Sequence, residues 1–336
     1  MDAQNLFRAA LVRPFTAVVL PMFFSLSGFL VAGSLARTKT LVMFMGLRAI
    51  RIFPALAVEV VLSALILGPL VTRYGLPDYF SSSLFGRYFY NLVGHVQFVL
   101  PGVFLDNPIP NFVNAQLWTV PFELYCYLAL GGLAIVGIAK RPLLFLAAVI
   151  GIQCVHFYVA HPPIGSMLTG DQRLYLSGTN LVMAFLCGVL AYLFRDRIPW
   201  DRRLFVMMLA GSYPLLATPI GDFVAPLPIA YVTVFLGLLN PRKIGLLRGA
   251  DYSYGLFLYG YAIQQTLAFL GLRDWYTNLP LALLATCLFA ALSWHMIEKP
   301  ALGARAGLRV LERGWLSLKT WIVGGWTNLV PILRTR

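Results

Sequence analysis

The chain has 336 residues, of which 59% are hydrophobic and 12% are charged, and its mean hydropathy is +0.77. Soluble domains carry roughly 45–50% apolar and about 25% charged residues, so this composition excludes a soluble globular enzyme. It predicts an all-α polytopic membrane protein. The net charge of +13 then belongs to membrane-flanking loops, and no nucleic-acid partner is expected.

Nine continuous apolar stretches have roughly the length that a helix needs to cross ~30 Å of hydrocarbon, which is about 20 residues. Because the stretches are continuous rather than alternating, the pattern predicts helices and not strands. In chain order they are 15–36, 52–72, 117–137, 142–160, 178–194, 204–220, 226–239, 252–270 and 279–297. The sequence thus predicts a transmembrane helical bundle of about nine spans.

The distribution of Lys and Arg predicts the orientation of this bundle. Of the 26 basic residues, 20 lie on one side of the spans, in 37–51, 138–141, 195–203, 240–251 and 298–336. Cytoplasmic loops are enriched in Lys and Arg, so this side and the C-terminus are predicted to be cytoplasmic, in the inner (plasma) membrane. Nine spans then place Met1 outside, although Arg8 and Arg13 favour the cytoplasm. One further helix ahead of the first span would reconcile the two predictions.

Two segments outside the spans are distinctive. The connection 73–116 is long and rich in aromatic residues, which predicts an ordered segment that suits either a sugar ring or the membrane interface. The segment 301–336 mixes apolar with basic residues, which predicts an amphipathic helix on the inner leaflet. The predicted division is a membrane domain, 1–300, followed by a cytoplasmic basic tail, 301–336.

Two arginines stand out near the cytoplasmic entry of the second span. Arg48 and Arg51 are three residues apart, so they share one helix face. Two guanidinium groups on one face match phosphate oxygens, as a nucleotide-like donor would present. The alternative is that both residues only anchor the span by their positive charge.

Acidic residues inside the predicted spans are functional candidates, because a charge in lipid is costly. Glu123, at the outer start of the third span, is a candidate for holding a proton, an arginine or a sugar hydroxyl, with structural pairing as the alternative. Glu59 is expected to pack or pair within the second span. His295 and Glu298 are three residues apart and are expected to form a structural pair. The histidines and cysteines show no metal-ligand spacing, so no metal site is expected.

Five segments of the chain resemble the acyltransferase 3 family of integral membrane O-acyltransferases, in the family's order. They are FFSLSGFLVAGSLART, RAIRIFPAL, DNPIPNFVNAQLWTVPFELYCY, SYGLFLYGYAIQQ and SWHMIEKPAL, and they extend from about Pro21 to Leu302. The resemblance implies ten transmembrane helices and no bound cofactor. It also implies acetyl-CoA or another acyl-CoA as co-substrate, and a hydroxyl of a polysaccharide or lipid-linked glycan as acceptor.

The resemblance implies roles for single residues as well. Arg48 and Arg51 match the family's R-x-x-R pair, which holds the donor. Three further motifs match: Trp118 and Glu123 lie in W-[ST]-x-x-x-E, Tyr259 in the S-Y-x-x-[YF]-L segment, and Glu298 in the closing E-x-P. The resemblance makes Glu123 the catalytic candidate. It makes Trp118, Tyr259 and Glu298 candidates for the substrate pocket.

The similarity starts at what the family has as its second helix. Family members begin with a helix that carries an Arg and a His resembling the acyl-transferring base, and no His precedes His95 here. A sugar hydroxyl needs a base poised near neutral pH, which is the usual work of histidine. The sequence therefore contains the arginine pair expected to bind the donor but no obvious general base.

Three hypotheses about function follow from these observations. The first is an enzyme, a membrane O-acyltransferase (an O-acetyltransferase in many relatives) that acts on a cell-surface or exported polysaccharide. The second is an inactive or truncated relative of such an enzyme. The third is a transporter of glycans or lipid-linked glycans, a class that often shows paired halves with broken helices, and no such repeat is visible in this sequence.

Overall fold

The computed structural model describes residues 13–38, 40–160, 178–217, 221–239, 249–310, 312–314 and 317. Within these residues the fold is all-α, apart from an isolated β-bridge between Thr72 and Val103. Each of the nine predicted apolar stretches contains a helix, so the helical class is confirmed. The helical segments long and apolar enough to cross a membrane are Arg13–Arg37, Leu41–Val71, Ala115–Ile135 and Trp275–Gly314.

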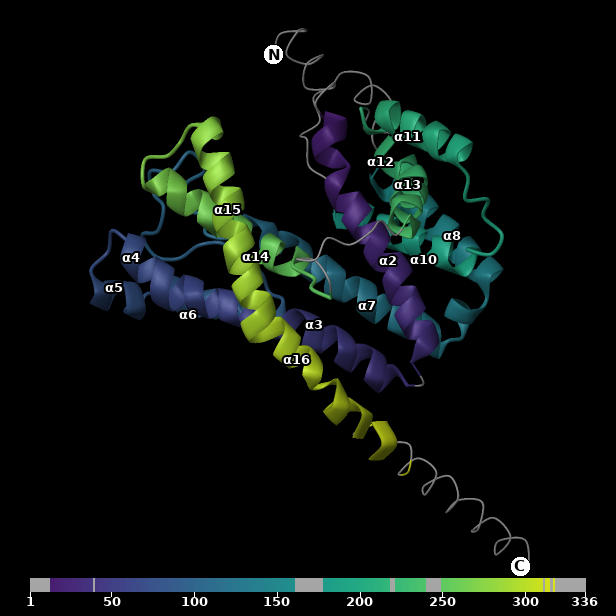
Figure 1. Cartoon of the computed structure of the whole chain (residues 1–336), viewed down its shortest axis with the longest axis horizontal. Coiled ribbons are helices and arrows are strands. Elements are labelled where there is room, and N and C mark those ends of the chain that lie inside the picture. The colour runs from purple at the N-terminus through teal and green to yellow at the C-terminus, as the bar shows by residue number, and fades with distance from the viewer. Residues whose placement is uncertain are drawn as a thin grey trace, which may run out of the picture. The chain divides into compact units, whose positions relative to one another are not determined.

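The chain forms two compact units, each built from two separate segments. Unit 1 comprises 1–37 and 121–243, and unit 2 comprises 38–120 and 244–336. Among the described residues, the α-helices of unit 1 are α2 (Val19–Arg37), α7 (Val120–Ile135), α8 (Pro142–Ala160), α10 (Gly178–Leu193), α11 (Arg202–Leu216), α12 (Gly221–Val224) and α13 (Pro226–Leu238). The α-helices of unit 2 are α3 (Leu41–Leu62), α4 (Gly68–Val71), α5 (Leu76–Ser81), α6 (Ser83–Tyr88), α14 (Ser253–Phe269), α15 (Trp275–Ser293) and α16 (Lys299–Gly303) (Figure 1).

The core of unit 1 is the crossing of α2 with α10, two helices that lie side by side in Figure 1. Glycine allows their backbones to touch: a Cβ atom added at Gly28 would lie 2.0 Å from the carbonyl oxygen of Phe185, and one at Gly188 would lie 2.0 Å from that of Ser25. The hydroxyl of Ser25 also donates to the carbonyl of Ala184 over 3.1 Å. Small residues at a helix crossing are typical of membrane bundles, where close packing replaces the hydrophobic effect.

The first helix of unit 2 is longer than the predicted span. Helix α3 begins at Leu41, where Thr40 caps it by accepting from the backbone amide of Met43 over 3.2 Å. Arg48 and Arg51 therefore lie inside a helix rather than at its entry. The helix continues past Pro54 into a π-helical turn, Ser63–Leu67, before α4 ends at Val71. Such π turns occur frequently at functional sites.

Helix α14 packs against α15 and against α3. Gly255 of α14 approaches the backbone of Ala290 in α15, and the hydroxyl of Tyr254 donates to the carbonyl of Ile52 in α3 over 3.0 Å. A second π-helical turn, Trp294–Glu298, joins α15 to α16. Beyond it the helix reaches the start of α3, where Leu308 contacts Gly46.

The connection between α4 and α7 is ordered, as its aromatic content predicted. Tyr79 and Tyr88 are completely buried, and the hydroxyl of Tyr79 donates to the carbonyl of Ala64 in the π turn over 2.7 Å. Burial raises the pKa of the Tyr79 hydroxyl above its ordinary value. The end of the connection is fixed to α14, because the side-chain amide of Gln265 donates to the carbonyls of Ile109 and Phe112, each over 2.8 Å. The segment therefore forms part of the body of unit 2.

Candidate functional site

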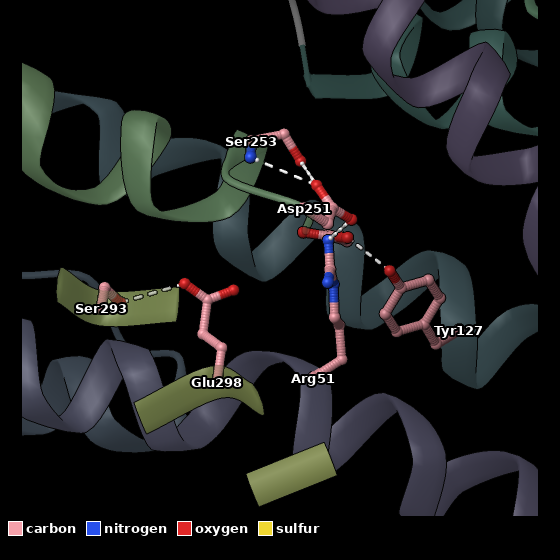
Figure 2. A network of polar contacts seen from close by, with 7 residues as sticks. Arg51, Tyr127, Asp251, Ser253, Ser293 and Glu298 are labelled. Atoms are coloured by element: carbon pink, nitrogen blue, oxygen red, sulfur yellow. Dashed lines mark hydrogen bonds and ion pairs between the residues drawn. The ribbon is translucent and has the colours of Figure 1, made fainter. Parts of the chain in front are cut away.

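Arg51, the second arginine of the α3 pair, bonds a carboxylate at the start of α14. Nη2 of Arg51 donates to Oδ2 of Asp251 over 2.6 Å, and both side chains remain partly exposed (Figure 2). Arg48, one turn earlier, is half-buried. A guanidinium carries five N–H donors in a planar fork, more than one carboxylate oxygen uses. The bond to Asp251 therefore holds Arg51 in place and leaves N–H donors of its guanidinium that suit a second anionic partner.

Asp251 is itself oriented by the first turn of α14. Its Oδ1 atom accepts from the hydroxyl of Ser253 over 2.6 Å and from the backbone amide of Ser253 over 3.2 Å (Figure 2). Partial burial acts to raise the pKa of Asp251, but the Ser253 hydrogen bonds and Arg51 outweigh it and hold the pKa below its ordinary value. Asp251 is therefore ionised near neutral pH and provides a fixed counter-charge for Arg51.

Glu298 lies at the end of the second π turn and is buried, with 3% of its surface exposed. Its Oε1 atom accepts from the hydroxyl of Ser293 over 3.0 Å (Figure 2). The hydroxyl of Tyr259, on α14, lies close enough to Ser293, Glu298 and Glu59 to interact electrostatically with all three. Unit 2 thus brings two predicted pocket residues, Tyr259 and Glu298, into one polar cluster.

The expected pairing of His295 with Glu298 gives way to other contacts. Glu298 bonds Ser293, whereas Nε2 of His295 lies 3.5 Å from the hydroxyl of Tyr252. The reason is the π turn, because its wider winding changes the spacing at which side chains share a helix face.

A second polar row lies further along α3. Oε1 of Glu59 accepts from the hydroxyl of Ser63 over 2.6 Å and from the side-chain amide of Asn114. Gln116 donates to Oδ1 of Asn114 over 2.6 Å and to the carbonyl of Leu258 over 2.8 Å. Trp118, the third predicted pocket residue, lies on the same 3₁₀ turn as Gln116, within Ala115–Thr119, and is partly exposed.

Glu123 lies in unit 1, on the first turn of α7. The hydroxyl of Tyr127, one turn later, donates to its Oε1 atom (Figure 2). The catalytic candidate is therefore held by a neighbour on its own helix, which favours neither a structural nor a chemical role.

Sequence reasoning missed several partners of the predicted residues. These are Asp251, Ser253, Ser293, Asn114 and Gln116. Asp251 had a usable signal, since it is an acidic residue immediately before an apolar helix. In the part of the chain that the structure describes, no group of three or more His, Cys, Asp or Glu side chains is placed to hold a metal ion.

Comparison with known proteins places the chain in a family. The profile of the acyltransferase 3 family, an acyltransferase domain, matches residues 3–298. An O-acetyl transferase of Shigella phage Sf6 is 25% identical over 300 residues, which cover 84% of this chain and 84% of the phage protein. Nodulation protein 10 of Rhizobium leguminosarum bv. viciae is 29% identical over 320 residues, which cover 88% of this chain and 84% of that protein. No solved structure is significantly similar. The chain therefore belongs to the acyltransferase 3 family of membrane O-acyltransferases.

Proposed function

We propose that this enzyme transfers an acyl group, in the simplest case acetyl, from a cytoplasmic acyl-CoA to a hydroxyl of a cell-surface or exported polysaccharide. The family and the phage relative named as an O-acetyl transferase support the reaction class. The hydroxyl oxygen bonds to the acyl carbon, the C–S bond breaks, and the hydroxyl proton ends on the sulfur of CoA. The reaction needs no bound cofactor.

The observation that carries the proposal is the arginine pair of α3. Arg48 and Arg51 lie three residues apart on one helix, and Asp251 holds the guanidinium of Arg51 at 2.6 Å. CoA carries phosphates, and guanidinium groups bind phosphate through paired, charge-assisted hydrogen bonds. In this proposal the two arginines bind the donor, while Tyr259, Glu298 and Trp118 line the substrate pocket and Glu123 is the catalytic candidate.

The orientation belongs to the same proposal. The nine helical stretches span the inner membrane, with the 20 basic residues of the arginine-rich side and the C-terminus in the cytoplasm. This topology puts Arg48 and Arg51 where a cytoplasmic acyl-CoA arrives. In the same proposal 301–336 is a cytoplasmic basic tail whose positive charge favours anionic lipid headgroups. Most of this segment, 318–336, lies outside the described residues.

Complementation of a strain that lacks the gene tests the proposal. Ester groups on the purified polysaccharide are counted by proton NMR after expression of the wild type, Arg48→Ala or Arg51→Ala, with membrane insertion checked by immunoblot. Both variants should insert and leave the polysaccharide without ester. Arg195→Ala, which removes an exposed charge from the same side of the membrane, is the matched control and should restore the ester.

The alternatives give different results in the same strains. A transporter leaves polysaccharide trapped in the cell when its gene is deleted, whereas an acyltransferase mutant exports polysaccharide that lacks the ester. An inactive relative leaves the ester in place after deletion. Normal ester content in both arginine variants would contradict the proposed donor site.

A further inference from the structure

The polar row Glu59–Asn114–Gln116 lies inside unit 2, two helical turns along α3 from Arg51. Glu59 and Asn114 are buried, with 1% and 0% of their surfaces exposed. The row is held at both ends, because Ser63 donates to Glu59 and Gln116 donates to the carbonyl of Leu258, next to Tyr259. The three side chains are thus fixed relative to α3 and α14.

Two oxygen atoms at the ends of this row have no hydrogen-bond partner. They are Oε2 of Glu59 and Oε1 of Gln116, both inaccessible to solvent. Buried polar atoms are almost always satisfied in proteins, and an unsatisfied one costs free energy comparable to a lost hydrogen bond. The hydroxyl of Tyr88, which interacts with Glu59, is a third buried polar atom without a partner, so the Glu59 end of the row holds several polar atoms that a hydroxyl-bearing ligand can bond.

The chemistry of the two oxygens selects a hydroxyl-bearing ligand. The amide oxygen of Gln116 only accepts, while a carboxyl oxygen accepts when ionised and donates when protonated. A hydroxyl group both donates and accepts, so the hydroxyls of a sugar satisfy both ends in either case. Glu59 and Asn114 are buried whereas Gln116 is partly exposed, so the row approaches the surface at its Gln116 end. The same turn carries Trp118, which is also partly exposed and is an aromatic residue of the kind that packs on sugar rings.

The position of the row along α3 fits this ligand. Glu59 follows Arg51 by eight residues, which is about 12 Å along a helix axis. The π turn that begins at Ser63 adjoins Glu59, and π turns mark functional sites more often than plain helix does. The row therefore lies deeper in the proposed membrane than the arginines, on the side from which a non-cytoplasmic acceptor approaches.

We propose that Glu59 and Gln116 bind hydroxyl groups of the acceptor sugar, as a subsite separate from the Arg48 and Arg51 donor site. The inference rests on the proposed function and deepens it. Asn114 is a positioning residue that couples the two binding side chains, and Trp118 contacts the ring of the bound sugar.

Steady-state kinetics of the full chain in nanodiscs test the subsite. The donor is acetyl-CoA, and the acceptor probe is polysaccharide purified from the deletion strain, which lacks the ester. Gln116→Leu should raise the KM for the polysaccharide at least tenfold and leave the KM for acetyl-CoA within twofold of wild type. Gln153→Leu is the matched control, because Gln153 on α8 also has one bonded and one unpartnered amide atom, and its kinetics should not change.

Substitutions of Glu59 separate binding from structure. Glu59→Gln keeps the shape of the side chain but removes its charge, so it should raise the KM for the polysaccharide by a smaller factor than Glu59→Leu and leave the KM for acetyl-CoA within twofold of wild type. Glu59→Leu should raise only the KM for the polysaccharide.

An unchanged polysaccharide KM in Gln116→Leu overturns the subsite and leaves the unpartnered atoms to buried water. If Gln116→Leu does not insert, the isosteric Glu59→Gln variant decides: a loss of kcat at unchanged polysaccharide KM assigns Glu59 to proton transfer and overturns the binding role. Absence of transfer by the wild type instead refutes the proposed function itself.

Discussion

Replacing Gly28 by alanine should separate helices α2 and α10 and destabilise unit 1. The added Cβ atom would lie 2.0 Å from the carbonyl oxygen of Phe185, and real contacts of this kind almost never fall below 3.0 Å. The obstacle is backbone rather than a flexible side chain, so the helices themselves must move apart. A radial gap of about 0.5–1 Å already forfeits a quarter to a half of each dispersion contact.

The residues that lose contacts are the buried side chains of this crossing, such as Phe24, Leu181 and Phe185. Overpacking of this kind costs about 1–3 kcal/mol. For a protein segment of 150–250 residues, each kcal/mol lowers Tm by roughly 2–4 °C. Gly28→Ala should therefore melt several degrees below the wild type.

Thermal unfolding followed by fluorescence-detected size-exclusion chromatography measures this shift. Gly132→Ala is the control, because Gly132 lies in α7 with nothing within 4 Å of an added Cβ. That variant should unfold at or slightly above the wild-type temperature, since alanine gains about 0.5–1 kcal/mol over glycine inside a helix. Equal unfolding temperatures for Gly28→Ala and Gly132→Ala would refute the close crossing.

Two further predictions concern unit 2. Tyr79→Phe should lower the free energy of unfolding by about 1–3 kcal/mol, because it leaves the buried carbonyl of Ala64 without its hydrogen-bond partner. Tyr90→Phe, at an exposed position of the same connection, should leave the stability unchanged, and equal stability of the two variants contradicts this account. The stability supplied by the Arg51–Asp251 pair is present above the ordinary Asp pKa of 3.8 and is lost as pH falls through the lower pKa of the folded state. The Tm difference between wild type and Asp251→Asn should therefore be constant from pH 8 to 5 and shrink below about pH 4. A difference that already shrinks between pH 8 and 5 contradicts the lowered pKa.

The sequence predicted the helices better than the contacts among polar residues. Continuous apolar runs identify helices because only a helix satisfies its own backbone in lipid, and each predicted stretch does contain one. The bond between Glu123 and Tyr127 follows from their spacing of one turn. The pairing of Arg51 with Asp251 could not be predicted from the sequence, because 200 residues separate the two and no local pattern joins them.

The polar row of Glu59 shows the same limit. Asn114 lies 55 residues from Glu59, in an aromatic-rich connection whose path depends on tertiary contacts such as those of Gln265. The π turns at Ser63–Leu67 and Trp294–Glu298 were equally invisible, because a single widened turn leaves the apolar pattern of a helix nearly unchanged. Resemblance to the family, by contrast, did select Tyr259 and Glu298, which the structure brings into one cluster.

The most direct test of the central claim is label transfer by the purified protein in nanodiscs. Acetyl-CoA labelled in the acetyl group is incubated with ester-free polysaccharide, and label in the polymer and free CoA thiol are measured together. The proposed function predicts that label enters the polymer with one thiol released per ester, that Arg51→Ala abolishes the transfer, and that Arg195→Ala does not. Label transfer at the wild-type rate by Arg51→Ala would contradict the donor site, and thiol release without labelled polymer would contradict the acceptor class.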